Sequence, residues 1–419
     1  MADNISKIIY DKKQKFSCSN CPDICCKSFS IKVDKSYRNR LIELEEIKEI
    51  LKSKNKEFHK TDNNNYYLPS EYVSCENRCI FLHNEKHCII HRNYGYENKP
   101  LDCMTYPFSL YLDANENVHI EVSYKCKSII ENYGANLEDI KDQITSQLIN
   151  KEYYPEKYPL YDYCLEQGEI FKLAQKLKET INNTDYDIYE SILNYVVLLS
   201  KFKEHYYKTR DFDKFLNNYH VCFDMNIYSQ ANNNVYRYIN SLNLTNVLIY
   251  STYNRNNPLF KDVFKLSTIF IAYYVSIFSL SNKFKLYNSD KTLNLKKLPS
   301  IDFSLDKRSD ELIRRYLSSC IIRHKYLTIE NKDLNFFNKV IIMFSMIRIY
   351  SKIDSLLFNN EKIIYENVLN AISQVEFVYY HTNFKDIPVM SFHKVINAFI
   401  NNQISSPGTA YNVVYKGLS

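Results

Sequence analysis

Glycine is scarce in this chain of 419 residues, which contains five. Rossmann sites, P-loops and the glycine-rich loops of many methyltransferases need several glycines close together. Only a residue without a Cβ atom lets the backbone turn tightly and approach a phosphate. The five stand at Gly95, Gly134, Gly168, Gly408 and Gly417, so no such group occurs. The sequence therefore disfavours the common nucleotide-binding folds.

Long apolar runs and an apolar leader are also missing. The longest apolar run, "LSTIFIAYYVSIFSL" at residues 266–280, is shorter than the roughly 20 residues of a membrane-spanning helix. We expect it to form a buried core helix and expect no membrane span. The first residues, "MADNISKIIYDKKQKF", lack the apolar core of a secretory signal. We therefore expect a cytoplasmic protein whose thiols stay reduced.

Charge of one sign is not concentrated anywhere. The chain has 54 Lys and Arg against 48 Asp and Glu, a formal net charge of +6. No compact run of basic residues interleaved with aromatics marks a nucleic-acid footprint. The sequence thus indicates no nucleic-acid partner.

Cysteine, by contrast, is dense near the N-terminus, where nine of the twelve cysteines lie between Cys18 and Cys126. A chain of this length does not need disulfides to fold, so clustered thiols in a reducing compartment indicate metal or redox chemistry. The first cluster, "FSCSNCPDICC" at residues 16–26, has the spacing C-x2-C-x3-C-C. Thiolates spaced this way on a tight turn can converge on one soft metal centre.

The second cluster is more widely spaced: Cys75, Cys79, Cys88 and Cys103, followed by Cys126. The residues leave zinc and iron-sulfur chemistry both open. The adjacent first-cluster pair, Cys25 and Cys26, is awkward for one tetrahedral zinc, because neighbouring side chains diverge. The spacing C-x3-C-x2-C of radical S-adenosylmethionine enzymes is absent.

Other polar and thiol residues receive structural interpretations. Three histidines near Cys88 are interpreted as solvated loop residues rather than as metal ligands: His83, His87 and His91. Three cysteines, each alone in a helical stretch, are read as small buried apolar residues: Cys164, Cys222 and Cys320. Three polar residues beside the second cluster are interpreted as structural rather than catalytic: Asp102, Glu121 and Tyr124.

The pattern of apolar residues changes near residue 135. Before it, only residues 37–54 show helical apolar spacing at length. After it, i, i+3, i+4 spacing predicts helices at 137–149, 170–181, 188–207, 263–280, 310–327, 338–358 and 365–381. We predict a mainly α protein with a loop-rich cysteine metal-binding module at 1–134 and a multi-helix domain at 135–419. A polar stretch at 285–310 is either a long surface loop or a boundary between two helical halves.

A family resemblance rests on the cysteine segments. "FSCSNCPDICC", "CIFL", "CII" and "KPLDCMTYPF", followed by an isolated cysteine, resemble in order and spacing the YkgJ-type cysteine-cluster family, described as zinc- or iron-chelating. The resemblance covers residues 16 to about 126, roughly a quarter of the chain. A cysteine module before a long helical region, together with "IEVSYKCKS" at 120–128, is similar to the flagellin lysine N-methylases, the FliB group.

The resemblance implies a metal site, a cofactor and an activity. Its eight cysteines fall on Cys18, Cys21, Cys25, Cys26, Cys79, Cys88, Cys103 and Cys126. It implies a 4Fe-4S cluster, S-adenosylmethionine as methyl donor and a protein substrate, plausibly flagellin. The alternative is a non-catalytic zinc- or iron-binding protein whose helical region is an interaction platform. Eight thiols exceed the four that one cluster needs, which leaves the ligand set open.

Overall fold

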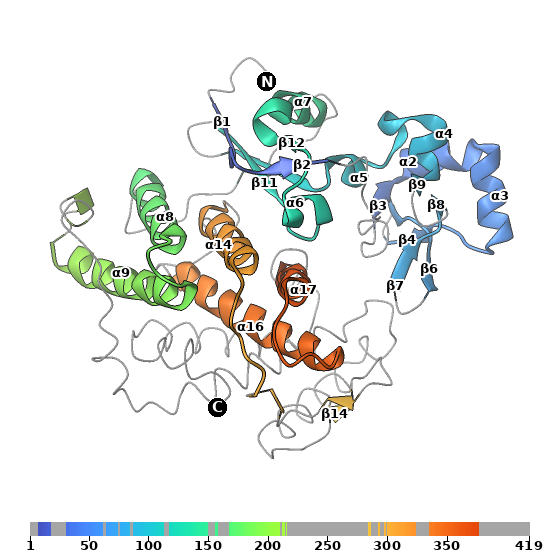
Figure 1. Cartoon of the computed structure of the whole chain (residues 1–419). Helices are drawn as coiled ribbons and strands as arrows, with labels where there is room; N and C mark the ends of the chain where they lie inside the picture. The colour runs from blue at the N-terminus through green and yellow to red at the C-terminus, as the bar shows by residue number, and fades with distance from the viewer. Residues whose placement is uncertain are drawn as a thin grey trace. The chain divides into compact units, whose positions relative to one another are not determined.

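The structure, a computed structural model, describes residues 7–17, 31–61, 64–73, 76–83, 87–112, 117–149, 156–157, 167–209, 212–213, 215, 284–285, 292–293, 297–298, 300–323 and 335–376. Its contacts divide the chain into two compact units, Met1–Tyr158 and Pro159–Ser419. The protein is mainly α, as predicted from the spacing of apolar residues, and its sheets are small (Figure 1).

The first unit contains a four-stranded sheet with the order β1-β11-β10-β13. Its strands are β1 (Ile8–Ile9), β11 (Val118–Val122), β10 (Phe108–Leu112) and β13 (Glu156–Lys157). β10 and β11 form an antiparallel hairpin, while β1 and β13 join its two edges in parallel. Leu110 and Val118 are fully buried, so apolar burial on β10 and β11 holds the short edge strands.

A second group of elements in the first unit precedes β10. Its strands are β3 (Lys32–Asp34), β4 (His59–Lys60), β5 (Asn65–Tyr67), β6 (Ser70–Val73), β7 (Glu76–Cys79), β8 (Leu82–His83) and β9 (His87–Cys88). Its helices are α2 (Lys35–Glu43), α3 (Glu45–Ser53), α4 (Ile89–Tyr94), the 3-10 turn η2 (Tyr96–Asn98) and α5 (Leu101–Thr105). The strands form the sheet β3-β5-β4 and the hairpins β6-β7 and β8-β9. A core that includes Ile47, Phe81 and Ile90 lies among these elements.

The single helix expected over residues 37–54 is in fact two. Leu44 adopts an extended conformation that ends α2 and starts α3. The break lets Leu41 and Ile47 both enter the same core, where they are 3% and 0% exposed. Glu45 and Glu46 then stand in the first turn of α3, where negative charge is favourable.

The first unit continues past residue 134, the end of the cysteine module in the sequence prediction. α7 (Leu137–Ile149) begins at the predicted residue and lies in the first unit, Met1–Tyr158. It is tied there because β12 (Ala135–Asn136) pairs with β2 (Lys15–Phe16) and the Leu137 N–H donates to the Gln14 carbonyl at 2.8 Å.

The second unit is built from helices near the predicted positions. They are α8 (Gln167–Asn182), α9 (Ile188–Thr209), α14 (Lys307–Ile322), α16 (Lys339–Leu357), preceded by the 3-10 turn η5 (Asn335–Asn338), and α17 (Tyr365–Glu376). A two-stranded hairpin joins β14 (Phe284–Lys285) to β15 (Thr292–Leu293). This hairpin and the start of α14 occupy part of the polar stretch at 285–310. The expected helix at 263–280 lies outside the described residues.

The central helix of this unit is α16, which packs against α14 and α17 (Figure 1). It is apolar around most of its circumference, the pattern of a helix enclosed by others. Buried Ser355 ties its C-terminal end to the next turn, since its hydroxyl lies 3.0 Å from the Asn360 carbonyl and 3.1 Å from the Lys362 carbonyl and shares its one proton between them. Across the bundle, the Tyr195 hydroxyl of α9 donates to the Phe337 carbonyl at 2.7 Å.

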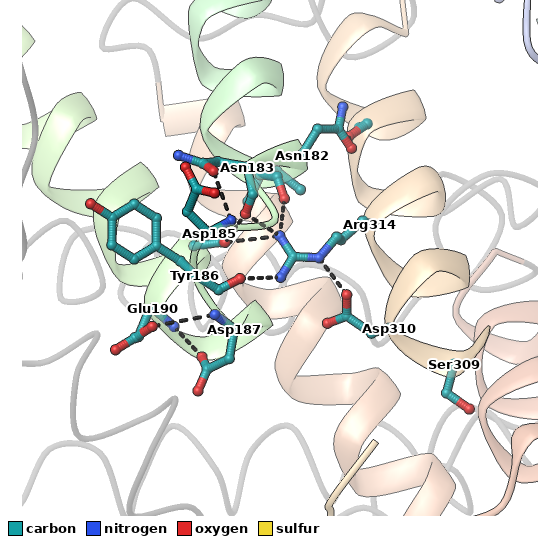
Figure 2. Close-up of polar contacts among 12 residues, drawn as sticks. Asn182, Asn183, Asp185, Tyr186, Asp187, Glu190, Ser309, Asp310 and Arg314 are labelled. Carbon is teal, nitrogen blue, oxygen red and sulfur yellow. Dashed lines mark hydrogen bonds and ion pairs between the residues drawn. The ribbon is translucent and has the colours of Figure 1, made fainter. Parts of the chain in front are cut away.

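Arg314 of α14 fastens the end of α8 and the following turn (Figure 2). Its Nη1 donates to the carbonyls of Ile181 at 2.6 Å and Asn183 at 3.0 Å, and its Nη2 donates to the Tyr186 carbonyl at 2.7 Å. Its Nε donates to Asp310 at 2.6 Å. The last carbonyls of a helix have no hydrogen-bond donor within that helix. The buried Arg314 guanidinium supplies donors to the carbonyls at the end of α8 and in the turn before α9.

A buried ion pair joins α14 to α17. Nη1 of Arg323, at the end of α14, lies 2.7 Å from Oε2 of Glu376, the last residue of α17. Both side chains are almost fully buried. Among the helices that the structure describes, none has the length and apolar character required to cross a membrane.

Candidate metal centre

Cys79 and Cys88 lie on neighbouring hairpins of the first unit. Cys79 ends β7 and pairs with Ser70 of β6, while Cys88 ends β9 and pairs with Leu82 of β8. The segment between them is anchored by Phe81, which is fully buried and accepts a 2.8 Å hydrogen bond from the Ile89 N–H. Both thiols are partly buried against the core that contains Phe81.

Cys103 lies in the short helix α5, which follows Pro100. Its backbone N–H donates to the Pro100 carbonyl at 3.0 Å. Proline is favoured immediately before or at the start of a helix because its φ is preset. Cys103 is partly buried, like Cys79 and Cys88.

The Tyr37 hydroxyl is a common neighbour of these three thiols. Tyr37, in α2, is 8% exposed, and its hydroxyl donates to the Asn98 carbonyl at 2.7 Å. Burial raises the pKa of Tyr37 far above its usual value, and negative charge on Cys103, Cys88 and Cys79 raises it further. Three of the eight predicted ligands therefore lie within electrostatic range of one phenol.

Charged groups flank this cluster of thiols. The Arg40 guanidinium lies 5.4 Å from the centre of the Tyr37 ring and opposes the rise in the Tyr37 pKa. Next to Cys103, desolvation raises the pKa of the Asp102 carboxyl, although Asp102 itself lies at the surface. A hydrogen bond from the backbone N–H of Lys32 and the Lys32 charge both oppose that rise. Arg40 and Lys32 are thus cations close to where thiolate charge gathers.

Cys126 belongs to the other group of elements. It is 4% exposed and precedes α6 (Lys127–Glu131), and its carbonyl accepts a 2.9 Å hydrogen bond from the Ile130 N–H. The segment before it leaves β11, where Glu121 is 8% exposed, and passes through the fully buried Tyr124.

The chain that leads into the first cysteine cluster is fixed beside α6. The backbone N–H of Ser17 donates to Oγ of Ser128 at 2.7 Å, and the Ser128 hydroxyl donates to the Tyr133 carbonyl at 3.0 Å. Two positions earlier, the Lys15 N–H donates to Oδ1 of Asn132 at 2.7 Å. Asn132 is the left-handed residue that ends α6. Ser17, the residue before Cys18, is therefore held against Ser128, which lies two positions after Cys126.

Gly134 permits this close approach. Its φ is +108°, and a Cβ atom there would lie 2.3 Å from the Phe16 carbonyl oxygen. A side chain at 134 would therefore clash with the backbone of β2. The Phe16 ring packs edge-on against Phe108 of β10, with ring centres 4.8 Å apart.

The chain that leaves the first cysteine cluster is fixed beside Cys103. The Ile31 carbonyl accepts a 2.9 Å hydrogen bond from the Leu68 N–H, and the next residue, Lys32, donates its backbone N–H to Asp102. The described residues on either side of positions 18–30 are therefore fixed at different places: Ser17 lies beside the helix that follows Cys126, and Lys32 lies beside Asp102, the residue before Cys103.

Some predicted ligands are not brought together by what the structure describes. Cys75 and all four cysteines of the first cluster lie outside the described residues. The four are Cys18, Cys21, Cys25 and Cys26. Among described residues, no three His, Cys, Asp or Glu side chains are close enough to hold one ion. His91 is exposed and packs against the Tyr96 ring, and Cys320 is buried in α14, as their interpretations require.

Sequence reasoning missed the residues that support the thiols. Tyr37, Ser128 and Asn132 carry no motif, because their partners lie 61, 111 and 117 positions away. Gly134 did carry a signal. In a chain with five glycines, a glycine eight residues after a predicted ligand marks a required backbone position.

Comparisons with known proteins give little on function. Over 214 residues, the chain is 24% identical to an uncharacterised protein of Methanocaldococcus jannaschii, covering 48% of this chain and 72% of that protein. No family model matches the sequence. No solved structure matches it either.

Proposed function

We propose that the first unit binds a thiolate-ligated metal centre, in its leading form a 4Fe-4S cluster with zinc as the alternative. The observation that supports this is that the charges of Cys79, Cys88 and Cys103 all act on the Tyr37 hydroxyl. The donors fit the group, because thiolates are the ligands of iron-sulfur clusters and of structural zinc. Cys126 and the four cysteines of the first cluster complete the candidate ligand set; the described residues that flank that cluster contact Ser128 and Asp102.

We further propose that the chain is an iron-sulfur-dependent protein lysine N-methyltransferase of the cytoplasm, acting on flagellin. This part rests on the resemblance to the flagellin lysine N-methylases. The amine of a substrate lysine would attack the methyl carbon of S-adenosylmethionine, so that a C–N bond forms while the C–S bond breaks and a thioether leaves. The lysine ammonium, with a free pKa of about 10.4, must first lose its proton to a base or to solvent.

The metal would have a supporting role in this scheme. A bound cluster would supply a Lewis-acidic iron for the polar groups of S-adenosylmethionine, or it would brace the loops around that ligand. The chain's own contribution is to hold the thiol-bearing segments through Tyr37, Ser128 and Asn132. Arg40 and Lys32 would partly neutralise the thiolate charge.

Elemental analysis after anaerobic purification tests the metal. We expect about four iron atoms and four sulfide ions per chain and broad absorption at about 400 nm. Cys103→Ala should lose metal, whereas the matched variant Cys320→Ala, in α14 of the second unit, should retain it. Zinc without iron after anaerobic reconstitution would overturn the iron-sulfur assignment.

Mass spectrometry of cellular proteins tests the activity. Lysines of flagellin should carry methyl groups in cells with the gene and lose them in cells without it, and Cys103→Ala should behave as the deletion does. Titration calorimetry with S-adenosylmethionine gives an independent measure of binding. Unchanged lysine methylation across the proteome together with no heat of binding would reject the methyltransferase.

A non-catalytic metal-binding protein is the second candidate. It is favoured by two buried arginines of the second unit that bind groups of the same unit: Arg314 binds the carbonyls at the end of α8, and Arg323 forms an ion pair with Glu376. Contacts of this kind build a rigid scaffold. Bound zinc with no affinity for S-adenosylmethionine would select this candidate.

A further inference from the structure

The described elements of the first unit fall into two halves. The hairpin half, within residues 31–106, holds α2 to α5 and β3 to β9. The sheet half, within residues 7–17 and 107–157, holds the sheet β1-β11-β10-β13, the pair β2-β12, α6 and α7. Every strand pairing that the structure describes in this unit joins strands of the same half. The chain passes from the sheet half to the hairpin half between residues 17 and 31, and it returns at the Tyr106–Pro107 peptide bond.

Packing and long-range hydrogen bonds hold each half together. The hairpin half has its own apolar core, formed by residues between 33 and 90, and α2 packs there against α3. Its Tyr37 hydroxyl donates to the Asn98 carbonyl at 2.7 Å. In the sheet half α6 packs against β2, where the Ser17 N–H donates to Oγ of Ser128 at 2.7 Å. These contacts stabilise the halves separately and do not join one half to the other.

Two predicted metal ligands, Cys103 and Cys126, stand on opposite sides of the Tyr106–Pro107 crossing. Cys103 belongs to α5, the last helix of the hairpin half, which ends immediately before Tyr106. On the other side, the Ser123 N–H donates to the Pro107 carbonyl at 2.8 Å, and the Cys126 N–H donates to the Ser123 carbonyl at 3.1 Å. Ser123 and Cys126 are 2% and 4% exposed. The backbone of Cys126 is therefore attached through Ser123 to the first residue after the crossing, and Cys103 lies four positions before that residue.

We propose that Cys103 of the hairpin half and Cys126 of the sheet half bind one shared metal centre, and that this metal fixes the two halves to each other. The inference rests on the metal site proposed above and adds which two thiols join the halves. A zinc–thiolate bond is about 2.3 Å long, and the thiolates of an iron-sulfur cluster likewise surround one compact group. Residues that share such a centre cannot separate, whereas the crossing alone leaves rotatable φ and ψ angles between the halves. Loss of the metal would therefore release the halves from each other.

Pulsed electron paramagnetic resonance on the full chain tests this tie. Spin labels are attached to a ketone-bearing amino acid placed at the exposed positions Glu49 of α3 and Asp142 of α7, so that the thiols stay unmodified. The metal-loaded wild type should give a narrow distribution of distances between the labels, and a chelator should broaden it. Cys126→Ala should give the broad distribution before and after chelation, because Cys126 is the thiol that the sheet half contributes. Cys103→Ala, which removes the other shared ligand, should behave in the same way.

A pair of labels within the sheet half, at the exposed positions Lys12 and Asp142, is the control for folding. Its distance distribution should stay narrow in every sample. Cys320→Ala, in the second unit, is the matched thiol variant and should behave as the wild type does. If elemental analysis shows bound metal, two results would each overturn the tie but leave the metal site standing: equal distributions between the halves before and after chelation, or a narrow one in Cys126→Ala. A wild-type chain that holds no metal would overturn the proposed metal site and this inference together.

Discussion

The backbone N–H of Ser17 donates a 2.7 Å hydrogen bond to Oγ of Ser128, across 111 positions of sequence. Ser17 immediately precedes the first cysteine cluster, and Ser128 lies in the helix that follows Cys126. The bond therefore fixes the start of one thiol-bearing segment relative to another. Its donor is a backbone group, so a substitution at residue 17 other than proline leaves that donor in place.

Ser128→Ala should loosen this attachment. Ser128 is fully buried, and the variant loses an acceptor for Ser17 and a donor to the Tyr133 carbonyl. Two buried partners left unsatisfied predict a loss of about 2 kcal/mol in the free energy of unfolding of the first unit, with faster metal release to a chelator. Chemical denaturation and chelator kinetics measure the two effects. Ser53→Ala, an exposed serine of α3, is the control and should change neither.

Asn132 allows the backbone conformation to be separated from the side-chain contacts. Asn132→Gly keeps access to the left-handed conformation but removes the acceptor used by Lys15, whereas Asn132→Ala also strains the backbone. We expect the alanine variant to be less stable than the glycine variant by about 1 kcal/mol. Equal thermal stability of the two would show that the backbone conformation at 132 contributes nothing.

Tyr37 variants test whether the phenol acts as a spacer between the thiols. Tyr37→Phe keeps the ring and loses the hydrogen bond to Asn98, which should cost about 1 kcal/mol while leaving the metal content unchanged. Tyr37→Ala opens a cavity beside Cys79, Cys88 and Cys103, and should cost about 3–5 kcal/mol and release metal. Elemental analysis and denaturation are measured on the same samples. Full metal content in Tyr37→Ala would contradict the spacer role.

Arg314→Met should destabilise the second unit strongly. The variant leaves the carbonyls of Ile181, Asn183 and Tyr186 without the donors they now have, at an expected cost of about 3 kcal/mol or more. Arg314→Lys should recover part of this loss, because an ammonium cannot reach all three carbonyls as a planar fork does. Lys307→Met, at an exposed position of the same helix, is expected to lie within about 0.5 kcal/mol of wild type. Thermal unfolding ranks the three variants.

The lowered pKa of Lys352 makes the free energy of unfolding depend on pH. Its pKa is lowered to about 8 in the folded protein, below the value of 10.5 expected when unfolded, and the causes in order are burial and Arg348, opposed by Asp302. Between those two values the unfolded state binds more protons, so this group makes stability rise with pH from about 8 to 10.5, while its penalty is fully present below pH 8.

Lys352→Met removes that penalty. Below pH 8 the variant should therefore be more stable than wild type by about 1–2 kcal/mol, a figure reduced for partial solvent exposure. The difference should shrink as the pH approaches 10. Unfolding measured in buffers without phosphate or sulfate, from pH 6 to pH 10, gives the profile. A constant difference across that range would show that Lys352 does not titrate near 8.

The helices of the second unit could be predicted because their signal is local. Apolar residues at i, i+3 and i+4 placed α16 within one residue of its observed ends, and the same spacing in the first unit placed α7 at its observed bounds. The break at Leu44 could not be predicted this way, because it depends on Leu41 and Ile47 sharing a core with residues of distant hairpins. The role of Arg314 was hidden for the same reason: its carbonyl partners lie about 130 positions earlier.

The candidate metal site also has a part that the sequence predicts and a part that it does not. Spacing alone identified the cysteines, since thiols packed this closely are rare by chance. The described strands of the first unit are two to five residues long and carry almost no periodic signal. Their positions depend on pairings such as Ile8 with Val118 and Phe16 with Ala135, which only the folded chain shows.

Those same pairings set the order of events during synthesis. β1 cannot join the sheet until β11 has left the ribosome, and Ser17 has no acceptor until residue 128 has been made. At about 5–20 residues per second, the first cysteine cluster would wait roughly 5–20 s for its anchors. Loop closure over such separations is slow, which delays folding of the whole unit. Metal loading of the nascent chain should therefore follow, rather than guide, completion of the first unit, and the exposed thiols would need protection from oxidation in that interval.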